Sequence, residues 1–263
     1  MKALQLLSLL PRHPAEFVDR TSAIITSRWE SVHLARPVYE PVNRGQAQRL
    51  LSAATGCEIS DCFDEPSLVV LESAVSDRRK RIPAEAPFGA FHNGDSLLGR
   101  LCYSLVRALK PTAIVETGVC YGVTSSYMLE ALSANSSGLL HSIDLPPLAK
   151  NGDDYVGWLV PQELRARWSL HRGTSNRLLP SLLAVLGQLD LFVHDSLHTY
   201  RNMTKEFAVA WPALRPGGVL ISDDIEGNKA FQELSLLPDV AASVVIKEED
   251  KDSLLGIAVK TSR

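Results

Sequence analysis

From about residue 96 onward, short and continuously apolar runs alternate with stretches of helical periodicity. A strand that is apolar along its whole length is buried on both faces, and links long enough to hold a helix allow parallel crossovers. The pattern therefore predicts the α/β class, with a doubly wound, mostly parallel sheet covered by helices on both sides. The predicted strands are residues 113–115, 139–143, 169–171, 189–193 and 218–221, and the predicted helices are 97–109, 124–132, 162–168, 176–186 and 200–214.

The C-terminal end breaks this alternation. Residues 242–247 and 254–260 both have the composition of strands, and only the charged stretch 248–253 separates them. Because so short a link cannot make a parallel crossover, we expect an antiparallel hairpin at the end of the sheet. Such an ending is uncommon among dehydrogenases.

The first 94 residues follow a different pattern, with several prolines and no strand rhythm. Helical spacing is present at residues 16–29 and 45–54, and the apolar start at 4–10 is typical of a short surface helix. We therefore divide the chain into a mainly helical or irregular N-terminal extension, 1–94, and an α/β domain, 95–263.

Composition limits the partners of the chain. The 27 basic and 30 acidic residues give a formal charge of −3, so no global positive field would attract nucleic acid or an anionic membrane. The apolar start is too short to span a bilayer, and the four cysteines lack CxxC spacing. We expect a cytoplasmic protein that binds neither nucleic acid nor membranes.

The residues 115–124, VETGVCYGVT, lie between a predicted strand and a predicted helix, where a doubly wound fold binds its ligand. Gly118 and Gly122 allow a tight turn and a close approach of the backbone. Cys120 replaces the middle glycine of a nicotinamide fingerprint, and Glu116 would repel a pyrophosphate but suits an amine-bearing ligand. The alternative is an ordinary βα turn in which Glu116 caps the next helix.

The next two strand ends carry similar signals. Asp144 ends a predicted strand, where an acid commonly accepts the two hydroxyls of a ribose. Ser175 and Asn176 follow the third strand, where they could reach an adenine edge or could start the next helix.

Five sequence blocks, in order, resemble the class I S-adenosylmethionine-dependent methyltransferases, in particular the bacterial group related to macrocin and rhamnosyl O-methyltransferases. The blocks are VETGVCYGVTSSYMLEAL, HSIDLP, WLVPQELRARW, GTSNRLLPSLL and LDLFVHDSLHTYRNMTKEFAVAWPALRPGGVLISDDI. The resemblance implies a seven-stranded, Rossmann-like methyltransferase sheet that ends in an antiparallel hairpin, with S-adenosylmethionine as the cofactor.

The resemblance also implies a set of cofactor contacts. Glu116, Gly118 and Gly122 would border the methionine end, and Thr124 or Ser125 would meet its carboxylate. Asp144 would bind the ribose and Ser175 with Asn176 the adenine, while Asp195 would border the same site.

Three acidic residues form a second candidate site. Asp195 follows one predicted strand, and Asp223 and Asp224 follow its expected neighbour in the sheet. Carboxylates that converge there would repel one another unless they are neutralised, and oxygen ligands suit Mg²⁺ or another hard divalent cation. The resemblance agrees, since catechol and macrocin O-methyltransferases hold a metal at these strand ends. Alternatively, Asp224 caps a helix near Asn228 and Asp195 bonds to a neighbouring loop.

His198 lies three residues after Asp195, which places both on one face of a helical turn. An imidazole can accept a hydroxyl proton near neutral pH, so His198 is the candidate base, with Asp195 also catalytic. The macrocin-like pattern has a second acid where this chain has Leu197, so the base in that branch is lost or has moved to His198. Alternatively, His198 only fixes the loop.

These features predict an O-methyltransferase acting on a hydroxyl of a small molecule, such as a sugar, polyketide or phenolic natural product, with help from a divalent metal. Residues 1–94, with the loop 88–94, would form the lid and the acceptor wall. The alternatives are a metal-independent N- or O-methyltransferase and, more distantly, a nucleotide-binding or NAD-dependent module. Whether the chain forms a homodimer stays open.

Overall fold

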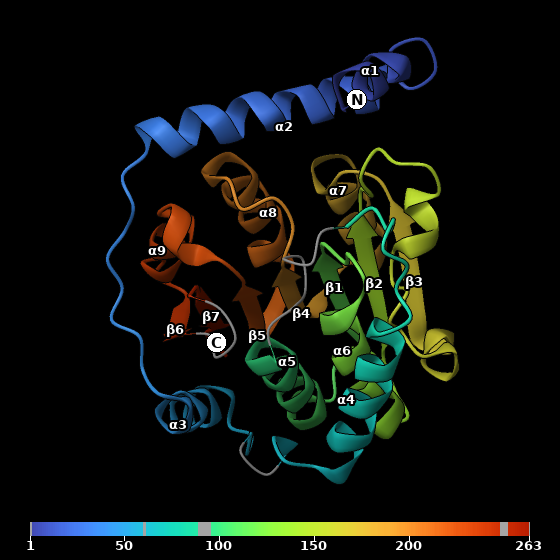
Figure 1. Ribbon diagram of the computed structural model, residues 1–263. Coiled ribbons are helices and arrows are strands. Elements are labelled where there is room, and N and C mark those ends of the chain that lie inside the picture. Colours follow the sequence, from blue (N-terminus) through green and yellow to red (C-terminus); the bar gives the residue numbers. More distant parts are fainter. Residues whose placement is uncertain (1, 60–61, 89–95, 248–251, 263) are drawn as a thin grey trace.

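A seven-stranded sheet runs through the molecule in the order β3-β2-β1-β4-β5-β7-β6 (Figure 1). The computed structural model describes all residues except 1, 60–61, 89–95, 248–251 and 263. The first five strands are parallel, and β7 runs antiparallel between β5 and β6. The predicted class and the terminal hairpin are confirmed. The strands are β1 (Ala113–Thr117), β2 (Leu139–Asp144), β3 (Trp168–Arg172), β4 (Leu189–His194), β5 (Leu214–Ser222), β6 (Val240–Lys247) and β7 (Leu254–Lys260).

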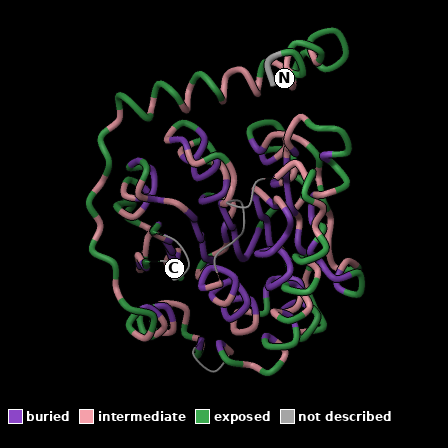
Figure 2. Tube along the Cα trace, in the orientation of Figure 1, coloured by how far each residue is buried: buried purple, intermediate pink, exposed green. Residues whose placement is uncertain are grey.

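Helices cover both faces of the sheet, as the apolar strands require. Successive residues of β4 point to opposite faces, so that Leu191 packs in one core and Phe192 in the other. Most of the buried residues lie along the sheet and the inner sides of these helices (Figure 2). The first core is covered by α3 (Arg44–Thr55), α4 (Pro66–Arg79), α5 (Ser96–Leu109) and α6 (Val123–Ala134), and the second by α7 (Ser175–Leu186), α8 (Tyr200–Ala213) and α9 (Ala230–Ser235).

Some elements differ from the prediction. The helices α4 and α9 carried too little apolar periodicity to be predicted, and residues 162–168 form a short 3-10 helix, η3 (Gln162–Arg167), rather than an α-helix. Two further 3-10 turns, η2 (Gly152–Tyr155) and η4 (Ile225–Gly227), follow strands β2 and β5. The predicted end of α5 before Pro111 is confirmed.

The N-terminal region has two parts. Leu51 of α3 and Leu71 of α4 belong to the same core as α5 and α6. By contrast, α1 (Lys2–Leu9) and α2 (Pro14–His33) lie outside it, and α2 crosses the end of the molecule beside α7 and α8 (Figure 1). Among the described residues, no helix has the length and apolarity needed to cross a membrane.

Candidate active site

Hydrogen bonds beyond the strand ends bring the predicted loops together. Asp195 N donates to Thr117 O (2.8 Å), and Gly118 N donates to Ile143 O (2.9 Å). Asp223 N donates in the same way to His194 O (2.9 Å). The turns that follow β1, β2, β4 and β5 therefore meet at one edge of the sheet, where a doubly wound fold holds its ligand.

Gly118 makes the closest of these approaches. Its φ is +86°, in the left-handed region, and a Cβ at this position would lie 1.8 Å from the carbonyl oxygen of Asp195. No side chain fits in that space, so glycine is required for the β1 turn to touch the β4 turn. Gly122 also has a positive φ (+85°), precedes α6 and packs against Gly157.

Glu116 is fully buried at the end of β1. Its Oε2 accepts hydrogen bonds from Ser125 (2.7 Å) and Ser142 (2.6 Å), while its buried Oε1 has no hydrogen-bond partner in the described part of the chain. Burial raises the pKa of Glu116 to about 7, against the opposing effect of the two hydroxyls. The carboxyl group bonds to these side chains and does not cap α6 through a side-chain hydrogen bond.

The remaining predicted cofactor residues lie around the same edge. Asp144 Oδ2 accepts from the backbone N–H groups of Val119 (2.6 Å) and Cys120 (2.9 Å), which fixes the β1 turn. Thr124 is buried in the first turn of α6 beside Ser125. Burial raises the pKa of Asp144, which these two N–H groups oppose.

Ser175 and Asn176 open α7 as predicted, but Thr174 is the N-cap residue. Asn176 Nδ2 donates to Asn202 Oδ1 (3.0 Å), and the Ser175 hydroxyl bonds to Glu206. Both side chains thus belong to a polar network behind the strand ends.

Asp195, Asp223 and His198 form a cluster whose candidate ligand atoms all lie within 4.8 Å of one another. Asp223 is almost fully buried, whereas the side chains of Asp195 and His198 are about one quarter exposed. His198 Nε2 lies 3.8 Å from Asp195 Oδ1 and 3.6 Å from Asp224 Oδ2. The cluster therefore contains His198 in the place where Asp224 was predicted. Asp224 has a left-handed backbone (φ +48°), and its carboxylate faces the imidazole.

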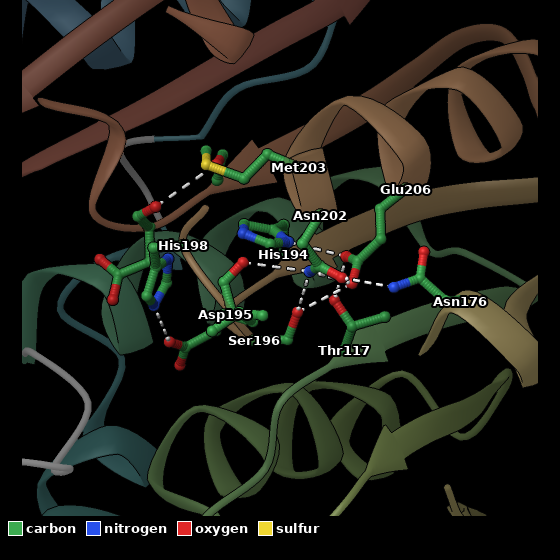
Figure 3. A network of polar contacts seen from close by, with 12 residues as sticks. Thr117, Asn176, His194, Asp195, Ser196, His198, Asn202, Met203 and Glu206 are labelled. Carbon is green, nitrogen blue, oxygen red and sulfur yellow. Dashed lines mark hydrogen bonds and ion pairs between the residues drawn. The ribbon is translucent and has the colours of Figure 1, made fainter. Parts of the chain in front are cut away.

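Behind this cluster lies a buried network that the sequence did not reveal (Figure 3). Glu206 of α8 pairs with His194 Nδ1 (2.7 Å) and accepts hydrogen bonds from Thr117 (2.6 Å) and Ser196 (2.8 Å). Asn202 Nδ2 donates to Glu206 (2.9 Å) as well. Glu206 thereby connects the ends of β1 and β4, the following turn and α8.

The electrostatics of Glu206 follow from these contacts. Burial alone would raise its pKa, but the charge and hydrogen bond of His194, with the hydroxyl donors, outweigh burial and lower the pKa to about 2. The sequence signal for the network was weak: Asn202 and Glu206 are polar residues four apart on a helix, which is ordinary for a solvated face.

His194 and His198 have separate surroundings. The His194 ring is fully buried, and its centroid lies 5.6 Å from that of Phe207 in α8. The backbone of His198 is fixed by a hydrogen bond, since Asn228 Nδ2 donates to His198 O (3.2 Å). The imidazole of His198 is thus directed by a fixed loop.

The expected lid is described only in part. Residues 89–94 lie outside the described residues, and before them Phe88 O accepts from Tyr121 OH (2.8 Å). Helix α2 also contacts the ends of two strands. Its Arg20 donates to Pro146 O (2.6 Å), just after β2, and its Glu16 pairs with Arg172 (3.0 Å) at the end of β3.

Comparison with known proteins agrees with this architecture. Residues 115–225 match the family model of a methyltransferase domain. The O-methyltransferase from Bacillus cereus in complex with SAH is 18% identical, with a TM-score of 0.56 over 82% of this chain and 97% of that chain. Comparison with curated protein sequences gives no match.

Two other solved structures are similar. TomG from Streptomyces achromogenes, an O-methyltransferase involved in tomaymycin synthesis and bound to SAM, is 19% identical (TM-score 0.52; 75% of this chain, 91% of that chain). SAH-bound PaMTH1 from Podospora anserina is 14% identical (TM-score 0.53; 85% and 99%). The matched residues run from β1 to the turn after β5, and the solved structures share the fold of this chain, so this part of the chain is similar to a methyltransferase domain.

Proposed function

We propose that this chain transfers the methyl group of S-adenosylmethionine to a hydroxyl of a small molecule, assisted by a divalent cation. The observation that carries the proposal is the cluster of Asp195, His198 and Asp223 at the carboxyl edge, next to the Gly118 turn. Oxygen and imidazole groups at this spacing can hold a cation and accept a proton. Two similar folds, from Bacillus cereus and TomG, are O-methyltransferases, which supports an oxygen acceptor.

The residues at the β1 turn fit a cofactor with an ammonium group. Glu116 Oε1 is buried without a hydrogen-bond partner in the described part of the chain, and an ammonium would supply the missing donor. Asp144 would bind the ribose, and Ser175 and Asn176 would border the adenine. Because the Ser125 hydroxyl already donates its hydrogen bond to Glu116, Thr124 is the better candidate to bind the methionine carboxylate.

The acidic residues fit a hard cation such as Mg²⁺. We assign Asp195 and Asp223 as ligands, since their oxygens lie close together and Asp223 is buried. When bound, the cation supplies a Lewis acid that lowers the pKa of a hydroxyl. Asp224 is then the partner of His198 rather than a third ligand, because it lies 3.6 Å from Nε2.

In this arrangement His198 receives the proton of the acceptor hydroxyl at Nε2. Asp195 and Asp224, on either side, stabilise the imidazolium that forms. The protein forms no covalent intermediate, since a sulfonium is already an activated donor, and its residues orient the acceptor for in-line attack. The acceptor would be a sugar, polyketide or phenolic hydroxyl, and α2 with the residues before 95 would help to enclose it. The low number of cysteines, four without CxxC spacing, supports a cytoplasmic location.

The proposal is tested by calorimetry and a methyl-transfer assay. We expect S-adenosylhomocysteine to bind with micromolar affinity and NADH not to bind; the reverse would indicate a nicotinamide-dependent module. Radiolabelled methyl transfer to a panel of phenols, sugars and polyketides, with and without EDTA, then identifies the acceptor. Activity that survives EDTA would favour metal-independent transfer with His198 as the base, and labelling of amines alone would contradict the O-methyltransferase assignment.

A further inference from the structure

Helix α2 turns an apolar face to the solvent. Val18, Ile25, Trp29 and Val32 are spaced seven, four and three residues apart, which places them on one side of a helix. They are 57%, 63%, 54% and 77% exposed, respectively, and no residue of α2 is buried. We call these four residues the outer stripe. An exposed apolar stripe on a folded domain indicates a binding surface.

Polar contacts on the opposite side fix the rotation of α2. Asp19 pairs with Arg177 (2.5 Å), and the Glu30 carboxylate accepts from the backbone N–H groups of Tyr200 (2.5 Å) and Arg201 (3.0 Å), at the start of α8. These contacts lie at both ends of the helix, so the outer stripe cannot rotate towards the core while they persist. Trp29 is stacked on His33 with ring centroids 4.8 Å apart, which holds the exposed indole in place.

We infer that the outer stripe binds the same stripe of a second copy of this chain, with the two α2 helices antiparallel. Val18 and Val32 are each seven residues from Ile25. A two-fold axis at Ile25 therefore places Val18 against the partner's Val32 and Ile25 against the partner's Ile25. The same register sets Trp29 against the partner's Thr21, a large side chain against a small one. Such a self-complementary surface is what an isologous dimer requires.

The charges of α2 favour a second copy over a membrane. The helix carries Arg20 and Arg28 against Glu16, Asp19 and Glu30, a net charge of −1 with His33 neutral. Amphipathic helices that bind anionic membranes carry Lys and Arg along the polar face. Here that face carries more acids than bases, and four of the charged residues of α2 already bond to the protein body.

The available area shows which other residues must take part. A helix of 20 residues is about 30 Å long and about 10 Å wide, so one face of α2 offers roughly 300 Å². A standard interface buries about 800 Å² per partner. The leucines of α1, Leu4 and Leu7, are also exposed and precede α2. Antiparallel pairing brings α1 towards the segment that follows α2 in the partner, where the partner's Val38 adds apolar surface.

Cysteine cross-linking of the full-length protein tests both the dimer and its register. Ile25→Cys should form a disulfide-linked dimer on mild oxidation, because residue 25 lies on the two-fold axis. Val18→Cys alone should not, because its copies would be about 21 Å apart along the helix. A mixture of Val18→Cys and Val32→Cys should cross-link. The wild-type protein, which has four cysteines, measures the background.

Light scattering and sedimentation test the surface without cross-linking. Ile25→Asp should convert the dimer to a monomer with unchanged circular dichroism, whereas Val185→Asp, at an exposed apolar residue of α7, should leave the dimer intact. A wild-type protein that is monomeric at every concentration would overturn the inference. So would self-cross-linking of Val18→Cys, or binding to anionic vesicles that Ile25→Asp abolishes while the protein stays monomeric.

Discussion

His194 and Glu206 are hydrogen-bonded inside the protein, with Nδ1 and Oε2 2.7 Å apart and both side chains at most 1% exposed. The pair lies directly behind the turn that carries Asp195 and His198 (Figure 3). Since Glu206 also accepts from Thr117 and Ser196, one carboxylate holds together several of the loops that form the site.

Glu206→Gln should destabilise the protein at pH 7 by about 2–3 kcal/mol, because it replaces the buried carboxylate that His194 and the surrounding donors contact. The amide would also turn a donor towards hydroxyl groups that already donate. Urea unfolding followed by circular dichroism measures the loss.

The pH dependence of unfolding gives a second test of Glu206. Its pKa is about 2 in the folded protein and 4.5 in the unfolded chain, so its contribution is complete above pH 4.5 and is lost as the pH falls towards 2. The wild type should therefore lose stability more steeply than Glu206→Gln in this range. Parallel curves would show that the Glu206 carboxylate does not contribute to stability in this pH range.

Glu116→Gln should separate stability from cofactor binding. The pKa of Glu116 is about 7 in the folded protein and 4.5 when unfolded, so this group favours folding most below pH 4.5 and loses that contribution as the pH rises through 7. At pH 8 the variant should be more stable than the wild type, by up to about 3 kcal/mol.

The same variant should bind S-adenosylhomocysteine at least about tenfold more weakly, since a neutral amide pairs poorly with an ammonium. Thermal denaturation and calorimetry at pH 6 and pH 8 measure the two effects. A variant that binds normally would exclude Glu116 from the ammonium site.

Gly118→Ala should be far more harmful than Gly56→Ala, although both glycines have a left-handed backbone. A Cβ at Gly56 meets nothing within 4 Å, so only the backbone cost of about 1–2 kcal/mol applies. At Gly118 the Cβ would collide with the Asp195 carbonyl, and we expect a loss of about 4 kcal/mol or more, or failure to fold. Equal melting temperatures would contradict the contact between the two turns.

Asp223→Asn and Asp224→Asn distinguish a cation ligand from a partner of the base. We expect Asp223→Asn to weaken Mn²⁺ binding at least about tenfold, measured by calorimetry or electron paramagnetic resonance. Asp224→Asn should change that affinity less than about threefold but shift the pH profile of methyl transfer to lower pH, since it removes a charge beside His198. Equal losses of Mn²⁺ affinity would make Asp224 a ligand.

The sequence predicts the sheet well because each strand is a local apolar pattern. Residues 113–115 and 189–193 needed only their neighbours to be recognised, and parallel topology then places Asp195 and Asp223 at one edge. The different placement of the Asp223 and Asp224 side chains could not be predicted. It depends on a left-handed residue in the turn after β5, which no local pattern specifies at an aspartate.

The other features that the sequence did not predict depend on contacts between residues far apart in the chain. Glu206 lies 89 residues from Thr117 in sequence, so their hydrogen bond has no local signal. In the same way, α2 has an ordinary helical sequence, and only the folded chain shows that its polar face meets Arg172 and Arg177.

The isolated pairing of Val42 with Ile246 has a consequence for how the chain can be shortened. Val42 N donates to Val245 O (2.8 Å), so the segment between α2 and α3 occupies part of the outer edge of β6. An uncovered edge strand is a template for association with other chains. A truncation that begins at Asn43 would keep α3 and the whole sheet yet expose this edge, and it should aggregate more readily than one that begins at Pro41.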